Sequence, residues 1–280
     1  MSSVVAVSAG LAVAWHYNAQ IDIIHAALTM AGVVMLHASV DILNDYWDYK
    51  RGIDKATQRT KMSGGTGVLP EGLLHPKQVY RAGMATLAAG AAIGTYFVII
   101  NGLIIAALLA FAVISIYFYS TRIVDSGLAE VFVAIKGACI VLGAYYIQAD
   151  MILLPAILSG TVIGILSATV LFVTSFPDYE ADRSRGRKTL VIVLGRERAA
   201  RLFWMFPAMA LGVIVISAST GVLPVYVLIA LLATPLAVKA GLQLRAGHND
   251  VKDLVPAMSN TIKFSRVAGV LLIVGLLIPY

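Results

Sequence analysis

The chain of 280 residues is 59% hydrophobic and only 13% charged, and its mean hydropathy of +0.86 excludes an ordinary water-soluble domain. The net charge of +6 does not indicate a nucleic-acid partner, because the basic residues lie in a few short connections between apolar stretches. The chain is therefore expected to lie in a lipid bilayer, as a single domain over residues 1–280.

Apolar stretches of about 20 residues, the length at which a helix crosses the hydrocarbon core, recur from one end of the chain to the other. They lie near residues 2–18, 20–45, 79–100, 102–120, 127–148, 151–176, 200–218, 222–243 and 263–279. The first is interpreted as a spanning helix rather than a signal peptide, because no basic segment precedes it and no small-residue cleavage site follows. The pattern predicts an all-α polytopic membrane protein of about nine transmembrane helices around a central cavity.

Lysine and arginine concentrate in the connections that follow the second, fourth, sixth and eighth stretches. Those nearest the acidic residues described below include Arg51, Arg59, Lys61, Arg122, Arg183 and Lys188. The connections around Asn18, Asn101, Asp150 and Gly221 contain no lysine or arginine. The positive-inside tendency therefore predicts that the N-terminus and the basic connections face the cytoplasm of a multi-pass cell-membrane protein.

Lys136 is the one basic residue well inside a predicted span. A lysine at membrane depth indicates a functional site. Pairing with Glu130, or extension of the side chain to the membrane surface, is an equally good interpretation. Cys139, the only cysteine, excludes an intramolecular disulfide.

Acidic clusters end the second and sixth apolar stretches. The first cluster occupies positions i, i+3, i+4 and i+7 of one helical face: Asp41, Asn44, Asp45 and Asp48. The second places Asp178 and Asp182 at i and i+4, and the predicted topology brings both clusters to the same side of the membrane. Because Mg²⁺ is usually held by a few carboxylates and phosphate oxygens, the clusters and their basic neighbours predict a site for Mg²⁺ and a phosphorylated substrate. Solvated helix ends are the plainer alternative.

At these residues the sequence resembles the UbiA superfamily of intramembrane aromatic prenyltransferases. The superfamily's first motif, NDxxDxxxD, is similar to NDYWD at residues 44–48 followed by Asp54, with Gly52 at the third aspartate position. Its second motif, DxxxD, matches DYEAD at residues 178–182. The trailing pattern is matched by Gly186, Lys188, Thr189 and Gly195. The similarity covers nearly the whole chain.

Within the superfamily the chain most resembles the menaquinone-type branch, which prenylates 1,4-dihydroxy-2-naphthoate. The resemblance rests on NDYWDYKRGID at 44–54, GGTGVLPEGLL at 64–74 and GLAEVFVAIKGACIVLGAYYIQ at 127–148. The chain departs from the branch at Thr174, Ser175 and Pro177, where two asparagines and an arginine usually stand. The basic, proline-containing segment that usually precedes the first helix has no counterpart in this sequence.

The resemblance implies Mg²⁺-dependent transfer of a polyprenyl group from a prenyl diphosphate to a small aromatic acceptor, with 1,4-dihydroxy-2-naphthoate of menaquinone biosynthesis expected. Two Mg²⁺ ions are expected, held by Asn44, Asp48, Asp178 and Asp182. The residues expected to bind the diphosphate are Arg51, Arg59, Lys61, Arg122, Arg183 and Lys188. The candidate catalytic residues are Asp45, Asp54, Tyr117 and Tyr119, the tyrosines because their ring faces stabilise cationic charge.

Other acceptors remain open, namely hydroxybenzoate, haem, chlorophyllide and a glycerol phosphate ether lipid, because such enzymes share the metal motifs. An ion-coupled membrane transporter is the alternative from another functional class, since intramembrane carboxylates and glycine-interrupted helices also mark ion pathways. A transporter predicts charge near mid-span, whereas most acidic residues here lie at the membrane boundary.

Overall fold

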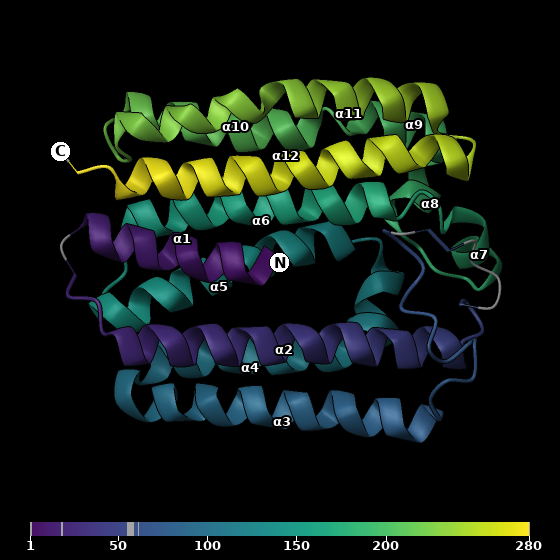
Figure 1. The fold of residues 1–280 in the computed structure, drawn as a ribbon, viewed down its shortest axis with the longest axis horizontal. Helices are drawn as coiled ribbons and strands as arrows, with labels where there is room; N and C mark the ends of the chain where they lie inside the picture. Colours follow the sequence, from purple (N-terminus) through teal and green to yellow (C-terminus); the bar gives the residue numbers. More distant parts are fainter. Residues whose placement is uncertain (1, 18, 55–58, 61, 280) are drawn as a thin grey trace.

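The computed structural model describes residues 2–17, 19–54, 59–60 and 62–279, and this part of the chain contains helices but no strand (Figure 1). The N-terminal half comprises α1 (Ser2–His16), α2 (Ile23–Lys50), α3 (Pro76–Asn101), α4 (Leu103–Phe118), η1 (Tyr119–Ile123), η2 (Val124–Ser126) and α5 (Ala129–Ala149). The C-terminal half comprises α6 (Leu154–Thr174), α7 (Tyr179–Ser184), α8 (Leu190–Leu194), α9 (Arg196–Leu202), α10 (Met205–Ser219), η3 (Val225–Ala233), α11 (Thr234–Gly247) and α12 (Val251–Leu277). The predicted all-α fold is confirmed.

Within the described residues, 8 helical segments are long and apolar enough to cross a membrane. These are Ile23–Lys50, Pro76–Asn101, Leu103–Ser126, Ala129–Ala149, Leu154–Thr174, Arg196–Ser219, Val225–Gly247 and Val251–Leu277. The protein is thus a multi-pass integral membrane protein. The first predicted stretch is the exception, because α1 has only 15 residues and a rise of 1.5 Å per residue makes it roughly 22 Å long.

Two helices extend well beyond their apolar stretches. The last stretch was predicted near 263–279, which was wrong at its start, because α12 already begins at Val251, with Asp250 as its N-cap accepting a hydrogen bond from the backbone N–H of Lys252 (2.8 Å). Helix α2 continues past residue 45 to Lys50, in agreement with the single helical face predicted for Asp41 to Asp48. In both places the helix carries polar residues beyond the apolar stretch, so hydropathy alone underestimates its length.

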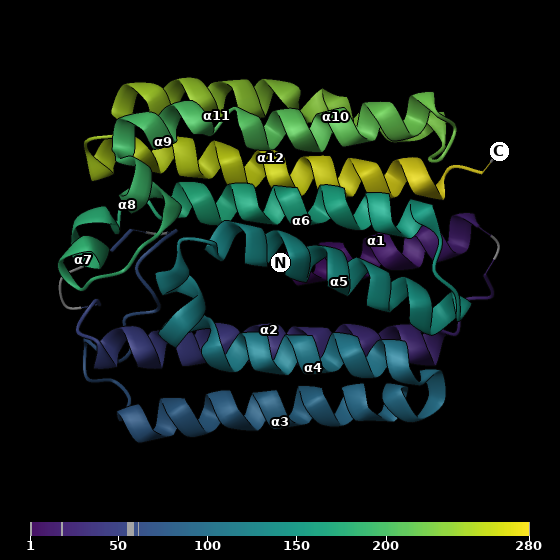
Figure 2. The ribbon, with the colours of Figure 1, turned by 180° about the vertical axis from the view of Figure 1, so that it is seen from behind.

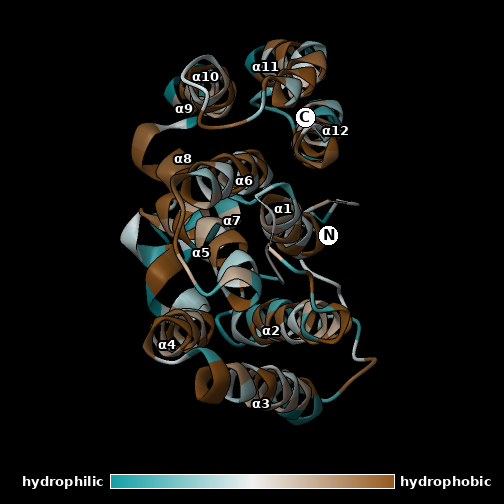
Figure 3. Ribbon diagram, turned by 90° about the vertical axis from the view of Figure 1, so that its left-hand side faces the viewer, coloured by the Kyte–Doolittle hydropathy of each residue, from teal (hydrophilic) through white to brown (hydrophobic). Residues whose placement is uncertain are grey.

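The long helices run side by side along the longest axis of the molecule (Figures 1 and 2). Seen end-on, α2, α3 and α4 form one sector, α6, α10, α11 and α12 form the other, and α1 and α5 lie between them (Figure 3). The C-terminal end of α2 and the short helices α7 and α8 lie at the same end of the bundle. The two acidic clusters therefore lie at the same end of the bundle, as predicted.

The middle of the bundle is held together by small residues on α5 and α6. A Cβ atom on Gly164 would lie 2.1 Å from the carbonyl oxygen of Ala134, and one on Gly137 would lie 2.7 Å from the Cα of Gly164. Glycine at such positions lets two membrane helices approach closely. Helix α6 consequently forms the buried centre of the bundle, with Leu166 and Phe172 in its core.

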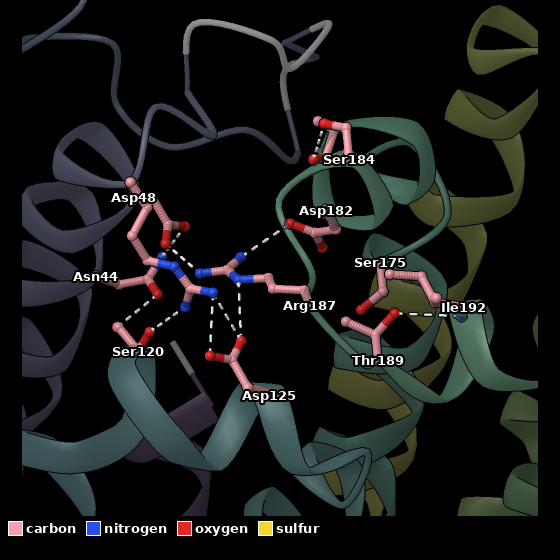
Figure 4. Close-up of polar contacts among 12 residues, drawn as sticks. Asn44, Asp48, Ser120, Asp125, Ser175, Asp182, Ser184, Arg187, Thr189 and Ile192 are labelled. Atoms are coloured by element: carbon pink, nitrogen blue, oxygen red, sulfur yellow. Dashed lines mark hydrogen bonds and ion pairs between the residues drawn. The ribbon is translucent and has the colours of Figure 1, made fainter.

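The chain bends where α4 ends. Helix α4 continues into the five-residue π-helix η1, then into the 3₁₀ turn η2, which ends at Gly127 in the left-handed conformation (φ 76°). π-helical turns are often found at functional sites because they redirect side chains. Here the bend turns Ser120 and Asp125 toward the end of α2 (Figure 4).

Candidate active site

A cavity of about 130 Å³, which we call the acidic chamber, lies at the end of the bundle where α2 meets α7. Its polar lining includes the residues predicted to bind metal together with Asp54, Tyr119 and Arg187: Asn44, Asp48, Asp54, Tyr119, Asp178, Asp182 and Arg187. Asn44 and Asp48 come from the last turns of α2. Asp178 is the N-terminal residue before α7 and Asp182 lies inside that helix. The fold thus brings all four predicted metal ligands to one cavity.

Arg187 occupies the space between the two acidic clusters. Its guanidinium group forms an ion pair with Asp48 on α2 and a second with Asp182 on α7, where the Nη1 to Oδ1 distance is 3.1 Å (Figure 4). Its Nε atom lies 4.0 Å from a carboxylate oxygen of Asp125. The residue is only 7% exposed. Arg187 was not singled out from the sequence, where it is one of several basic residues that follow the sixth apolar stretch. Its position five residues after Asp182 was the available signal.

A hydrogen-bond network holds the α2 side of the chamber. The side-chain amide of Asn44 donates to Asp48 (3.1 Å), and the Ser120 hydroxyl donates to the amide oxygen of Asn44 (2.8 Å). Arg51 donates to the Ser120 carbonyl (2.9 Å) and to the Asp125 carboxylate (3.1 Å). Arg51, predicted to bind diphosphate, therefore connects the bend after α4 to the end of α2.

Asp45 does not line the chamber, and its carboxylate contacts the loop that follows α2. The backbone N–H and the hydroxyl of Thr66 both donate to the Asp45 carboxylate, at 3.2 and 2.5 Å. A Cβ atom on Gly65 would lie 2.9 Å from that carboxylate, and Gly65 has a positive φ of 69°. The structure therefore places Asp45, a predicted catalytic residue, where it anchors the glycine-rich loop at residues 64–67.

Four further cations that were predicted to bind diphosphate do not line the chamber: Arg59, Arg122, Arg183 and Lys188. Arg59 forms an ion pair with Glu71 (2.6 Å). The guanidinium carbons of Arg122 and Arg183 lie over the rings of Phe118 and Tyr179, at 5.7 and 5.9 Å from the ring centres. The side chain of Lys188 is exposed.

Lys61, the last of the predicted diphosphate-binding residues, lies outside the residues that the structure describes.

The two predicted catalytic tyrosines are placed differently. Tyr119 lines the acidic chamber and also the cavity beneath it. Tyr117 is 43% exposed and its ring meets Phe118 edge-on at 5.1 Å, on the outer surface of α4. The structure brings Tyr119 to the metal-ligand candidates and leaves Tyr117 apart from them.

Burial and mutual repulsion raise the pKa values of the chamber's carboxyl groups. Burial, then the charges of Asp182 and Asp48, raise the pKa of Asp178 to about 7. Burial, then the charges of Asp48 and Asp45, raise the pKa of Asp54 to about 7. Burial raises the pKa of Asp182 to about 6, although Arg187 opposes the shift. The chamber therefore holds more negative charge than Arg187 neutralises, and bound cations would relieve it.

The chamber residues fit Mg²⁺. Within the described part of the chain, no three histidine, cysteine or acidic side chains form a complete metal cage. Mg²⁺ does not require one, because it is commonly held by one or two carboxylates with water and substrate phosphate oxygens completing the octahedron. Asp178 has a buried carboxylate oxygen with no hydrogen-bond partner among the residues that the structure describes, and carboxylates lie on both α2 and α7. A Mg²⁺ ion held by these carboxylates and by a substrate phosphate would give the unpartnered oxygen a ligand and neutralise the negative charge.

Two further cavities continue from the acidic chamber into the bundle. The central cavity, of about 350 Å³ between α1, α2, α5, α6 and α12, shares Tyr119, Leu171 and Thr174 with the chamber. The apolar cavity, of about 130 Å³ between α2, α3, α4 and α5, shares Lys136 and Ile140 with the central cavity. The three cavities therefore change in character along the bundle: the acidic chamber is polar, the central cavity is mixed and the third cavity is apolar.

Lys136 does not pair with Glu130. The Glu130 side chain is buried, and neither of its carboxylate oxygens has a hydrogen-bond partner among the described residues. Lys136 instead lies in the wall shared by the central and apolar cavities.

Comparison with known proteins identifies this arrangement. The chain is 27% identical to the 1,4-dihydroxy-2-naphthoate octaprenyltransferase of Bacillus subtilis (strain 168), covering 100% of this chain and 89% of the relative. It is 26% identical to the enzyme of the same name from Escherichia coli (strain K12), covering 97% and 89%.

Solved structures share the fold at low identity. A UbiA homolog from Aeropyrum pernix K1 superposes with a TM-score of 0.74 at 16% identity, covering 97% of each chain. A UbiA homolog from Archaeoglobus fulgidus bound to GPP and Mg²⁺ superposes with a TM-score of 0.61 at 16% identity, covering 97% of this chain and 95% of that one. The model of the UbiA prenyltransferase family matches residues 3–261. The chain therefore belongs to the UbiA prenyltransferase family and is a membrane prenyltransferase.

Proposed function

We propose that this enzyme transfers a polyprenyl group from a prenyl diphosphate to 1,4-dihydroxy-2-naphthoate, in the synthesis of a menaquinone-type lipid quinone. The observation that carries the proposal is the acidic chamber, in which carboxylates from α2 and α7 face one another above cavities inside a membrane bundle. The naphthoate acceptor is supported by full-length similarity to two octaprenyltransferases of that specificity. Mg²⁺ and a prenyl diphosphate are supported by the bound ligands of the Archaeoglobus fulgidus homolog.

Two Mg²⁺ ions would be held by the two clusters. Asn44 and Asp48 would hold one ion, and Asp178 and Asp182 the other, each with diphosphate oxygens as further ligands. When bound, Mg²⁺ supplies Lewis-acid neutralisation of the diphosphate leaving group. Asp125 and Arg51 keep the α2 side of the chamber in place through the Ser120 network.

Arg187 is the chain's own diphosphate ligand in this proposal. Its guanidinium group already lies between the clusters, where it neutralises Asp48 and Asp182. A planar guanidinium forms two parallel hydrogen bonds to phosphate oxygens. Once cations neutralise the carboxylates, Arg187 is able to turn to the diphosphate. Arg59, Arg122, Arg183 and Lys188 are proposed to attract the anionic substrate through their positive charge. Lys61, which lies outside the described residues, is proposed to do the same on its charge alone.

Bond breaking and bond making occur where the chamber opens into the central cavity. The allylic carbon–oxygen bond breaks and the diphosphate keeps the electron pair. The ring face of Tyr119, which borders both spaces, stabilises the cationic carbon. The electron-rich acceptor ring forms the new carbon–carbon bond, and its carboxylate leaves as CO₂. Enclosure between helices keeps water from the cation.

Asp54 is the better-placed candidate to take a proton from an acceptor hydroxyl group as the ring attacks and to return it once CO₂ has left, which gives the quinol. It lines the chamber, and burial together with Asp48 raises its pKa to about 7, which suits proton transfer near neutral pH. Asp45 instead binds Thr66. The basic connections at this end of the bundle support an active site on the cytoplasmic side, by the positive-inside tendency.

The proposal is tested with purified protein in detergent, geranylgeranyl diphosphate, Mg²⁺ and a panel of acceptors led by 1,4-dihydroxy-2-naphthoate. We expect a prenylated naphthoquinol by mass spectrometry, lost without Mg²⁺ and in Asp48→Ala and Asp178→Ala. Product formed only with hydroxybenzoate or another acceptor would keep the chemistry and overturn the naphthoate assignment. Absence of diphosphate release with every acceptor would refute the proposal and favour transport.

A further inference from the structure

The central cavity contains charged side chains that the proposed chemistry does not use. His37 and Asp41 project from α2, Lys136 from α5 and Arg266 from α12. Asp41 and His37 lie close together, with 3.6 Å between the carboxylate and the ring nitrogen. Neither Lys136 nor Arg266 forms an ion pair with a carboxylate of the described residues.

Two cations therefore face one carboxylate in this cavity, and protonation of His37 only adds to the excess. Lys136 lies seven residues from the start of α5, roughly 10 Å below the acidic chamber's end of that helix. Charged groups at such depth are costly and occur where they serve a ligand or a pathway. The excess of positive charge favours a ligand that carries one negative charge.

The position of the cavity limits what that ligand is. The central cavity shares Tyr119, Leu171 and Thr174 with the acidic chamber, so its occupant lies beside the carbon that the diphosphate releases. The diphosphate itself is accommodated by the acidic chamber, and the apolar cavity suits the prenyl chain. A volume of about 350 Å³ lies in the range of small-molecule sites. The central cavity is therefore the space left for the remaining substrate, the acceptor.

We propose that Lys136 and Arg266 form a carboxylate-binding subsite that selects aromatic acids as acceptors, with Asp41 and His37 bordering the same cavity. The inference rests on the proposed prenyl transfer and adds the residues that determine acceptor choice. Lys136 on α5 and Arg266 on α12 donate charge-assisted hydrogen bonds to the acceptor's carboxylate, and the ring extends toward Tyr119. Asp41 lines the same cavity and offsets part of its positive charge while the acceptor is absent.

Binding measurements test the subsite without catalysis. The full chain in phosphatidylcholine nanodiscs is titrated with 1-hydroxy-2-naphthoate and with 1-naphthol, which lacks the carboxylate. We expect Lys136→Met and Arg266→Gln each to weaken naphthoate binding about 10- to 100-fold, the size of one charge-assisted hydrogen bond, and to change naphthol binding less than about twofold. Lys136→Arg retains the charge and should retain most of the affinity.

The control is Lys239→Met, the same change at an exposed lysine of α11 outside the cavities. Wild-type affinity for the naphthoate in both Lys136→Met and Arg266→Gln, or an equal loss of naphthoate and naphthol, would overturn the subsite. During turnover the same variants should raise KM for 1,4-dihydroxy-2-naphthoate without changing KM for the prenyl diphosphate. If the wild type binds the naphthoate through these residues but transfers no prenyl group, only the proposed function fails.

Discussion

Helix α2 borders all three cavities, and the acidic chamber and the apolar cavity differ most. Its last turns supply Asn44 and Asp48 to the acidic chamber, where each side chain has a named partner. Its middle contributes Gly32 and Leu36 to the apolar cavity, whose lining is mostly hydrophobic. A directed polar network loses its function when one member changes, whereas an apolar wall distributes its effect over many contacts. Substitutions are therefore expected to have large effects in the chamber and small ones in the apolar cavity.

The largest effect is expected for loss of one carboxylate. Asp178→Asn and Asp182→Asn preserve side-chain size but remove the charge of a proposed metal ligand, and kcat should fall by about 10²- to 10³-fold, as for loss of one preorganised electrostatic group. Product formation at saturating Mg²⁺ measures it. The control is Asp22→Asn, the N-cap of α2 at the other end of the helix, where asparagine caps equally well. Equal losses in all three variants would indicate a folding defect instead.

Arg187→Met tests whether this arginine stands in for cations in the chamber. Breaking a buried ion-pair network costs about 3–5 kcal/mol, so the metal-free variant should melt well below the wild type. Mg²⁺ with inorganic pyrophosphate should restore much of the difference, because cations then neutralise Asp48 and Asp182. Arg198→Met, at an exposed position of α9, is the matched control. If Mg²⁺ and pyrophosphate do not reduce the difference in melting temperature between the variant and the wild type, Arg187 has a purely structural role.

The pH dependence of stability should reverse when Mg²⁺ is added. The pKa values of Asp178 and Asp182 are raised to about 7 and about 6 in the folded protein. Protonation therefore stabilises the metal-free fold, and this stabilisation is present below about pH 4 and lost as pH rises through 6 to 7. Mg²⁺ requires the ionised carboxylates, so the Mg²⁺-induced rise in melting temperature should be several degrees larger at pH 8 than at pH 5.5. A rise independent of pH would contradict these values.

The smallest effect is expected in the apolar cavity. Gly143 borders it, and a Cβ atom there would make only ordinary contact with Leu108, at 3.4 Å. Gly143→Leu should fill space needed by a long prenyl chain and lower kcat/KM for long relative to short prenyl diphosphates by about three- to tenfold, the scale of one or two methylene contacts. Gly212→Leu on α10, where a Cβ atom meets nothing within 4 Å, is the control. A loss as large as that of the Asp178 variant would break the contrast between the two spaces.

Local patterns predicted much of this molecule. Hydropathy identified the helical spans, because a bilayer requires long apolar helices whatever their neighbours. The i, i+4 spacing put Asn44 with Asp48 and Asp178 with Asp182 on common faces, and the distribution of basic residues placed both pairs at the same end. Both inferences depend only on helix geometry and the membrane.

Side-chain partners were decided by the tertiary structure alone. Residues next to one another in the motif diverge: Asp48 meets Arg187 across the chamber, while Asp45 turns to Thr66. The approach of Lys136 and Arg266 to one cavity depends on how α5 and α12 are placed around it. A sequence motif specifies which residues share a helix face, but the element that a face meets depends on packing between helices distant in the chain. That packing is non-local, and no spacing within one segment encodes it.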